Sequence, residues 1–105
     1  MVNPMRGEVE IMLDGVPHIA RLTLGALAEL ETELATGSLV EMAGRFEEGQ
    51  FSAVDVIAVV VAGLRGGGWR GTRAELLVAE IAGGPVGAAQ AAAQLLARAF
   101  SVPAG

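Results

Sequence analysis

The 105-residue sequence contains no cysteine, no lysine and no tyrosine, and it has one histidine and one tryptophan. The absence of cysteine excludes disulfides, thiol nucleophiles and cysteine-ligated metals. The absence of lysine excludes a phosphate-binding loop of the Walker type, because its lysine reaches the terminal phosphates. A lone imidazole would need three carboxylates to complete a zinc site. We therefore expect no metal, and we interpret His18 as a packing residue beside a turn.

Charged residues are also scarce, at 18 %, and the net charge is −5, with arginine supplying all seven basic side chains. An acidic chain repels the nucleic-acid backbone unless its basic groups cluster strongly. Here only Arg65, Arg70 and Arg73 lie close together, so we expect no nucleic-acid partner. Hydrophobic residues make up 52 %. That fraction exceeds the ~45–50 % of average domains and indicates apolar surface for a protein partner.

Long hydrophobic runs are missing as well. The most apolar run, Val56 to Ala62, is far shorter than the ~20 residues that a membrane-spanning helix needs. The N-terminal sequence MVNPMRGEVE lacks the apolar stretch of a secretory signal. We therefore expect a soluble cytoplasmic protein with no membrane partner. The length fits one domain over residues 1–105, with short flexible ends at 1–6 and 101–105.

Residues 8–22 have the pattern of a β-hairpin. The segments EVEIML and VPHIARL flank Asp14-Gly15, a dipeptide typical of two-residue hairpin turns. Such a turn predicts three pairs on one face: Leu13 with Val16, Ile11 with His18, and Val9 with Ala20. Pro17 lacks a backbone N–H, which indicates an edge strand. A lone hairpin is only marginally stable, so it must pack on the segments that follow.

Capping residues divide residues 23–100 into helices. The predicted helices are 24–35 after Thr23, a short one from Ser38 to Gly49, 53–64 after Ser52, 73–82 after Thr72, and a last one from Pro85 to about Phe100. The helix at 53–64 is apolar nearly all round and should be the most buried element. The predicted fold class is α+β, an N-terminal β-hairpin followed by a compact bundle of about five short helices.

The stretch LRGGGWRG, residues 64–71, lies between two of these helices. Its glycines predict a turn that ends one helix and redirects the chain. In the simplest interpretation Trp69 packs over the helix junction, and the arginines are solvated or pair with carboxylates. Two alternatives stay open: Trp69 stacks on a nucleic-acid base, or the loop contacts a protein partner.

The polar residues do not form a catalytic set. Ser38, Ser52 and Thr72 are explained as helix caps. Glu31 falls among the leucines of the first helix in projection, and we expect it to bridge to Arg21. An acid catalyst would require a second polar partner in a cleft, and none converges on Glu31. We expect a protein that is not an enzyme and has no cofactor.

The segments RGEVEIMLDG, ARLTLGALAELE and FSAVDVIAVVVAGLRGGG, followed by an alanine-rich C-terminus, resemble the gene transfer agent family protein. This small protein is encoded among the tail genes of phage-like gene transfer agents of alphaproteobacteria and of related prophages. The resemblance covers about residues 6–100. It implies one of two roles: a tail assembly chaperone that keeps the tape-measure protein soluble, or a tail-tube protein. Tail tubes generally use extended β-sheets, so the predicted helices favour the chaperone.

The resemblance implies protein partners: the tape-measure protein, the tail-tube subunit and a companion chaperone. It leaves a homo-oligomer open. We expect contacts through the apolar faces of residues 24–34 and 88–100 and through the glycine loop. The candidate partner-binding residues are Leu24, Leu27, Leu30, Leu34, Arg65, Trp69, Leu95, Leu96 and Phe100.

An alternative of another class is a small helix-turn-helix DNA-binding regulator, formed by residues 53–64 and 72–82. Its second helix would offer DNA only Arg73, while Glu75 and Glu80 would oppose binding.

Overall fold

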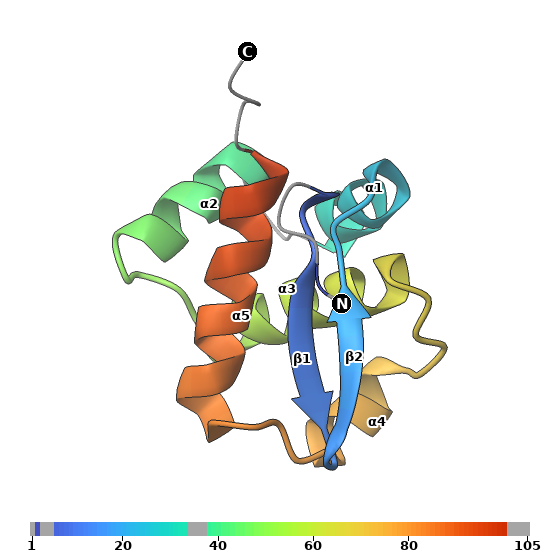
Figure 1. The fold of residues 1–105 in the computed structure, drawn as a ribbon. Coiled ribbons are helices and arrows are strands. Elements are labelled where there is room, and N and C mark those ends of the chain that lie inside the picture. The colour runs from blue at the N-terminus through green and yellow to red at the C-terminus, as the bar shows by residue number, and fades with distance from the viewer. Residues whose placement is uncertain (1, 3–5, 34–37, 101–105) are drawn as a thin grey trace.

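The computed structural model describes residues 2, 6–33 and 38–100, so Leu34 and the predicted flexible end at 101–105 lie outside the described residues. The elements, in chain order, are β1 (Val9–Leu13), β2 (Val16–Ala20), α1 (Leu24–Glu33), α2 (Leu39–Glu47), α3 (Ala53–Gly66), α4 (Arg73–Val78) and α5 (Gly84–Ala99) (Figure 1). This order confirms the predicted α+β class, a hairpin followed by five helices.

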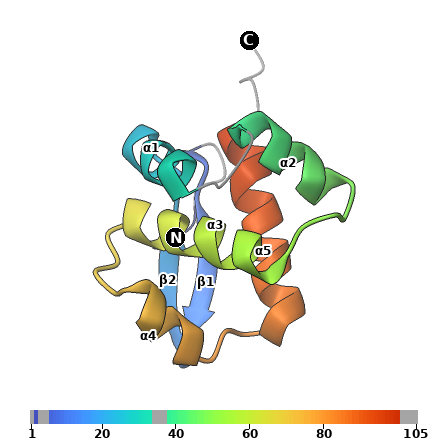
Figure 2. The same ribbon diagram turned by 180° about the vertical axis from the view of Figure 1, so that it is seen from behind.

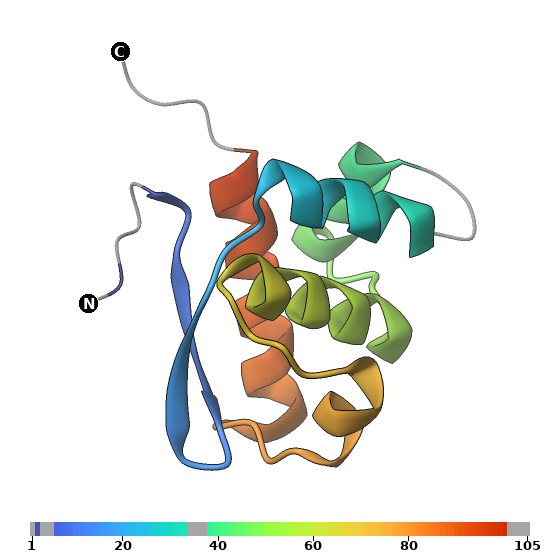
Figure 3. The same ribbon diagram turned by 90° about the vertical axis from the view of Figure 1, so that its right-hand side faces the viewer.

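The hairpin has the predicted register, with Leu13 opposite Val16 next to the turn. Asp14 and Gly15 take positive φ angles of 51° and 80°, as a two-residue turn of this kind requires at both positions. The side chains of β1 alternate between buried and exposed, so one face of the hairpin joins the core. Figure 3 shows the hairpin along one side of the molecule, with α1, α3 and α4 stacked beside it.

The central helix is α3, as its apolar sequence predicts. Nearly all its residues from Val56 to Leu64 are buried, and it contacts α1, α4, α5 and β2. Figure 2 shows α3 crossing over the hairpin. The hairpin and all five helices contribute buried side chains to one hydrophobic cluster.

Helix starts follow the predicted caps. The Ser52 hydroxyl accepts a hydrogen bond from the Asp55 N–H, and the Asp55 carboxylate accepts one from the Ser52 N–H, each at 3.1 Å. Thr72 and Glu75 form the same reciprocal capping box at the start of α4. These side chains satisfy N–H groups that the first helical turn leaves without intrahelical partners.

The predicted fourth helix, 73–82, is wrong in its length, because α4 ends at Val78. The next residues run extended and pair with the hairpin turn. The Asp14 N–H donates to the Glu80 carbonyl at 2.8 Å, and the Ala82 N–H donates to the Met12 carbonyl at 3.2 Å. A helix continuing to residue 82 would lose these bonds, so tertiary pairing outweighs local helix propensity here.

The predicted apolar face of the first helix is also wrong in part. Leu24 is 85 % exposed, whereas Leu30 is fully buried beside Ala26. Ala26 faces the C-terminal end of α3, where a Cβ on Gly66 would lie 3.3 Å from the Ala26 Cβ. The small side chain therefore sits at the close contact and the large Leu24 points outward. Glu31 is exposed rather than among buried leucines, and the pairs Arg45–Asp55 and Arg65–Glu29 do not include it.

Candidate partner-binding surface

The glycines of LRGGGWRG allow α3 to lie directly on the backbone of β2. A Cβ on Gly66 would lie 2.0 Å from the Arg21 carbonyl oxygen, and one on Gly67 would lie 1.8 Å from the Ile19 carbonyl oxygen. The Arg21 N–H donates to the Gly63 carbonyl at 2.8 Å in the same region. Of the three glycines only Gly68 has a positive φ, 104°. The predicted turn is confirmed at Gly68, while the close approach at its two neighbours is an additional role.

Trp69 packs against the hydrophobic core and is half-buried, as the packing interpretation predicts. A Cβ on Gly71 would lie 2.0 Å from Cζ2 of the Trp69 ring, so the glycine leaves room for the indole.

Arg65 pairs with Glu29, with 3.7 Å between Nη2 and Oε1, and both side chains are about half exposed. Such an exposed pair contributes only ~0–1 kcal/mol. Arg70 and Arg73 line an open hollow beside this loop.

The structure separates the candidate partner-binding residues into two groups. Leu30, Leu95 and Leu96 are core residues with at most 2 % of their surface exposed, so they have no surface to offer a partner in this fold. Leu27 is half-buried and packs against the same core. The remaining described candidates reach the surface: Leu24, Arg65, Trp69 and Phe100. Leu34 lies outside the described residues.

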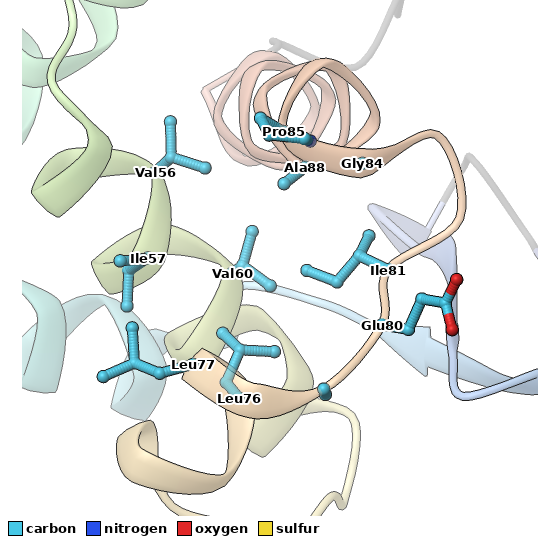
Figure 4. Close-up of a pocket in the computed structure, with 11 residues that line it drawn as sticks. Val56, Ile57, Val60, Leu76, Leu77, Glu80, Ile81, Gly84, Pro85 and Ala88 are labelled. Carbon is cyan, nitrogen blue, oxygen red and sulfur yellow. The ribbon is translucent and has the colours of Figure 1, made fainter.

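An apolar hollow of about 340 Å³ opens between α3, α4, the segment 79–81 and the start of α5. Figure 4 shows Ile57 and Val60 of α3 beside Leu77 and Leu76 of α4. Ile81 and Pro85 face them from the other side of the hollow. Leu76 closes the floor of the hollow, since it is buried, whereas Leu77 is 59 % exposed at its edge.

A second apolar hollow of about 450 Å³ lies next to the first and is lined by Phe51, Val86, Ala89, Ala93, Gln90 and the shared Pro85. The Phe51 ring stacks on that of Phe46, with 4.7 Å between ring centroids, so one wall is fixed by the core. Val86 is 66 % exposed. We call the two hollows together the α4–α5 apolar face, defined by Phe51, Ile57, Leu77, Ile81, Pro85 and Val86.

The polar side chains of the described residues do not gather into a group that could hold a metal: no three His, Asp or Glu side chains lie together there. Within the same part of the chain, no helix combines the length and the hydropathy that crossing a bilayer requires. The α4–α5 apolar face is a surface suited to aliphatic side chains.

Residues 6–102 match the protein family described as phage tail tube protein, GTA-gp10. The chain belongs to this family. The match covers nearly the whole sequence and confirms the resemblance found over about residues 6–100. No curated protein and no solved structure matches the chain. Membership of the phage tail tube family supports a structural role in a phage-like tail, and it indicates protein partners within the tail assembly.

The candidate residues chosen from the sequence of this phage tail tube family member missed the α4–α5 apolar face. One local signal for it was present. Leu76 and Leu77 are adjacent in a helix of 6 residues, and neighbouring helical residues point in directions about 100° apart. Only one of them can be fully buried against α3, so the other must keep part of its surface exposed. The partner across the hollow, α5, could not be identified without the tertiary structure.

Proposed function

We propose that this protein is a tail assembly chaperone, which binds apolar helices of a tape-measure protein and keeps them soluble while tail-tube subunits assemble. The observation that carries the proposal is the α4–α5 apolar face. Leu77 and Val86 are 59 % and 66 % exposed beside hollows whose linings are mostly apolar. Monomeric proteins keep such patches small unless another macromolecule covers them.

The secondary structure also supports a chaperone over a tube-forming subunit. The described residues contain a two-stranded sheet with strands of 5 residues each. The edge of β2 that is not paired with β1 carries Pro17, which has no N–H to donate to a further strand. The C-terminal end of β2 is covered by the C-terminal turn of α3 at Gly66 and Gly67. A short, partly covered edge of this kind is poorly suited to building a continuous sheet with neighbouring subunits.

The charge distribution suits a protein that keeps an apolar client in solution. The net charge is −5. Glu31, Glu33, Glu41, Glu47 and Glu48 on or beside α1 and α2 are all exposed. Carboxylates are especially effective at maintaining solubility. In this role the protein acts in the cytoplasm of the producing cell, with the tape-measure protein, the tail-tube subunit and a companion chaperone as its partners.

Co-expression with the tape-measure protein tests the proposal. We expect the tape-measure protein to be soluble and to co-purify with this chain, and to aggregate when the chain is omitted. The chaperone role is contradicted if the tape-measure protein is equally soluble alone and does not co-purify.

A second candidate is a structural tail-tube component that stays in the particle. The family description, phage tail tube protein, favours it directly. The test is the composition of purified particles together with electron microscopy of the isolated protein. Stoichiometric retention in mature tails, or tubes formed by the pure protein, would support the structural component over the chaperone. We do not propose the DNA-binding regulator, because α4 has only 6 residues and its Glu75 is used in the cap.

A further inference from the structure

We propose that the α4–α5 apolar face binds one amphipathic helix of a partner protein, and that a cationic side chain of this helix lies beside Glu80. This inference rests on the proposed function, since it names the surface that holds the client and the chemistry of the segment held. The partner helix carries an apolar stripe with a basic residue at one end of that stripe.

The shape of the face supports an elongated apolar occupant. The hollows of about 340 and 450 Å³ both include Pro85 in their linings, so they adjoin along the first turns of α5. Side chains at i, i+3, i+4 and i+7 of a helix form one stripe. Such a stripe can place one aliphatic group in the first hollow, beside Leu77, and the next in the second hollow, beside Phe51.

The face is held by the fold and does not need the partner to form it. Its floor includes Val60, which is 1 % exposed, and Leu76, which is 4 % exposed. The segment after α4 is fixed to the hairpin by the bond from the Ala82 N–H to the Met12 carbonyl. A surface that is already ordered loses little conformational entropy on binding.

Charge at one end of the face selects a basic partner. Among the described residues that line the two hollows, Glu80 is the charged one. Figure 4 shows its carboxylate on the far side of the segment 79–81 from the Ile81 side chain, which points into the first hollow. Asp14 lies next to it: its Oδ1 accepts from the Glu80 N–H at 2.9 Å, and its N–H donates to the Glu80 carbonyl at 2.8 Å. Neither carboxylate belongs to the ion pairs of the described residues.

The same carboxylates disfavour a second copy of this chain as the occupant. A two-fold contact through the face would bring the Glu80 and Asp14 carboxylates of both protomers to one interface, in a protein whose net charge is already −5. An arginine or lysine from a different protein gains an attractive interaction at the same place. A homodimer through this face is therefore an outcome of the test that counts against the proposal.

The probe is a pair of synthetic alanine-based peptides of ~18 residues, long enough to form helix in water. Both carry one leucine stripe at helical spacing; one ends in arginines and the other in glutamates. We expect the arginine peptide to bind the wild-type protein more tightly, and its binding to shift the backbone NMR signals of residues lining the two hollows. Tighter binding of the glutamate peptide, or signal shifts confined to α1, would overturn the proposal.

Three variants locate the contact. We expect Leu77→Asp to weaken binding of the arginine peptide by about tenfold or more, the loss that an interface hot spot shows. Val40→Asp is the matched control, because Val40 is a helical aliphatic residue that is 71 % exposed on α2 and lines neither hollow, and its affinity should stay within about twofold of wild type. Glu80→Lys should weaken the arginine peptide by ~2–5-fold and strengthen the glutamate peptide by a similar factor. Equal losses in Leu77→Asp and Val40→Asp would contradict the assignment.

Sedimentation of the free protein completes the design. A monomer in both wild type and Leu77→Asp supports a foreign occupant, whereas a wild-type dimer that Leu77→Asp dissociates assigns the face to a second copy and overturns the proposal. Failures of the two proposals are distinguishable. If wild type and Leu77→Asp keep the tape-measure protein soluble equally well, the chaperone role stands and the binding role of the α4–α5 apolar face is wrong. If the peptide binds at the face but the protein does not keep the tape-measure protein soluble, the face stands as a binding site and the chaperone role is wrong.

Discussion

Helices α3 and α4 both carry apolar side chains, but they differ in how many of these side chains are buried. In α3, apolar side chains from Val56 to Leu64 are almost all buried. In α4, only Leu76 is buried, while Leu77 and Val78 are 59 % and 86 % exposed. Both helices begin with the same kind of capping box. Local sequence signals therefore start the two helices alike, and tertiary contacts decide how much of each is covered.

The packing around the two helices differs in the same direction. At the C-terminal end of α3, glycines bring the helix so near β2 that a methyl group would collide with a backbone carbonyl. Between α3, α4 and α5 there is instead an apolar hollow of about 340 Å³. The apolar side chains thus fall into two groups. One group is buried in a tightly packed core on the hairpin side, and the other is left exposed around the hollow.

Deleting a core side chain should give the largest effect on stability. Leu95 is fully buried and its Cδ1 would lie 2.6 Å from a Cβ on Gly63, which places it at the tight contact between α3 and α5. We expect Leu95→Ala to lower the free energy of unfolding by ~2–5 kcal/mol, measured by urea denaturation. Leu77→Ala, on the other side of the comparison, should lower it by less than ~1 kcal/mol. Equal losses would show that both regions hold the fold together.

Adding one methyl group at the glycine contact should give the next largest effect. Gly67→Ala places a Cβ against the Ile19 carbonyl, and relieving that clash must move α3 away from β2. We expect a loss of ~1–3 kcal/mol. Gly44→Ala is the control, because a Cβ there meets nothing within 4 Å in the middle of α2, and it should stabilise by ~0.5–1 kcal/mol. The two variants should therefore change the urea midpoint in opposite directions, and a stable Gly67→Ala would refute the close-approach argument.

Removing a helix cap should have a smaller effect. Thr72→Ala removes the hydroxyl that accepts from the Glu75 N–H at 3.2 Å, and we expect it to cost ~0.5–2 kcal/mol. Thr72→Ser keeps the hydroxyl and should stay close to wild type. Amide hydrogen exchange of α4 checks whether the loss is local. If the exchange of α4 amides is the same in both variants, the cap does not hold this side of the molecule.

Local rules explain what could be predicted from the sequence. The Asp14-Gly15 turn fixed the hairpin register, and Ser52 and Thr72 marked helix starts, because each acts on residues within one turn of itself. The burial of α3 followed from its composition.

Long-range contacts explain what could not be predicted. Residues 79–82 read as helix, but their backbone bonds with Met12 and Asp14 join segments more than sixty residues apart. The exposure of Leu24 depended on the close contact of Ala26 with Gly66. The α4–α5 apolar face needed two helices placed by the rest of the fold, so single-helix periodicity pointed to Leu95 and Leu96, which belong to the core.

The most direct test of the account is co-expression of the tape-measure protein with wild type, Leu77→Asp and Val40→Asp, recovering the client through the tagged chain. Because Leu77 lies outside the core, all three proteins should have unfolding free energies within ~1 kcal/mol of one another. The account predicts that wild type and Val40→Asp recover the soluble client and that Leu77→Asp does not. Full recovery by Leu77→Asp would contradict it.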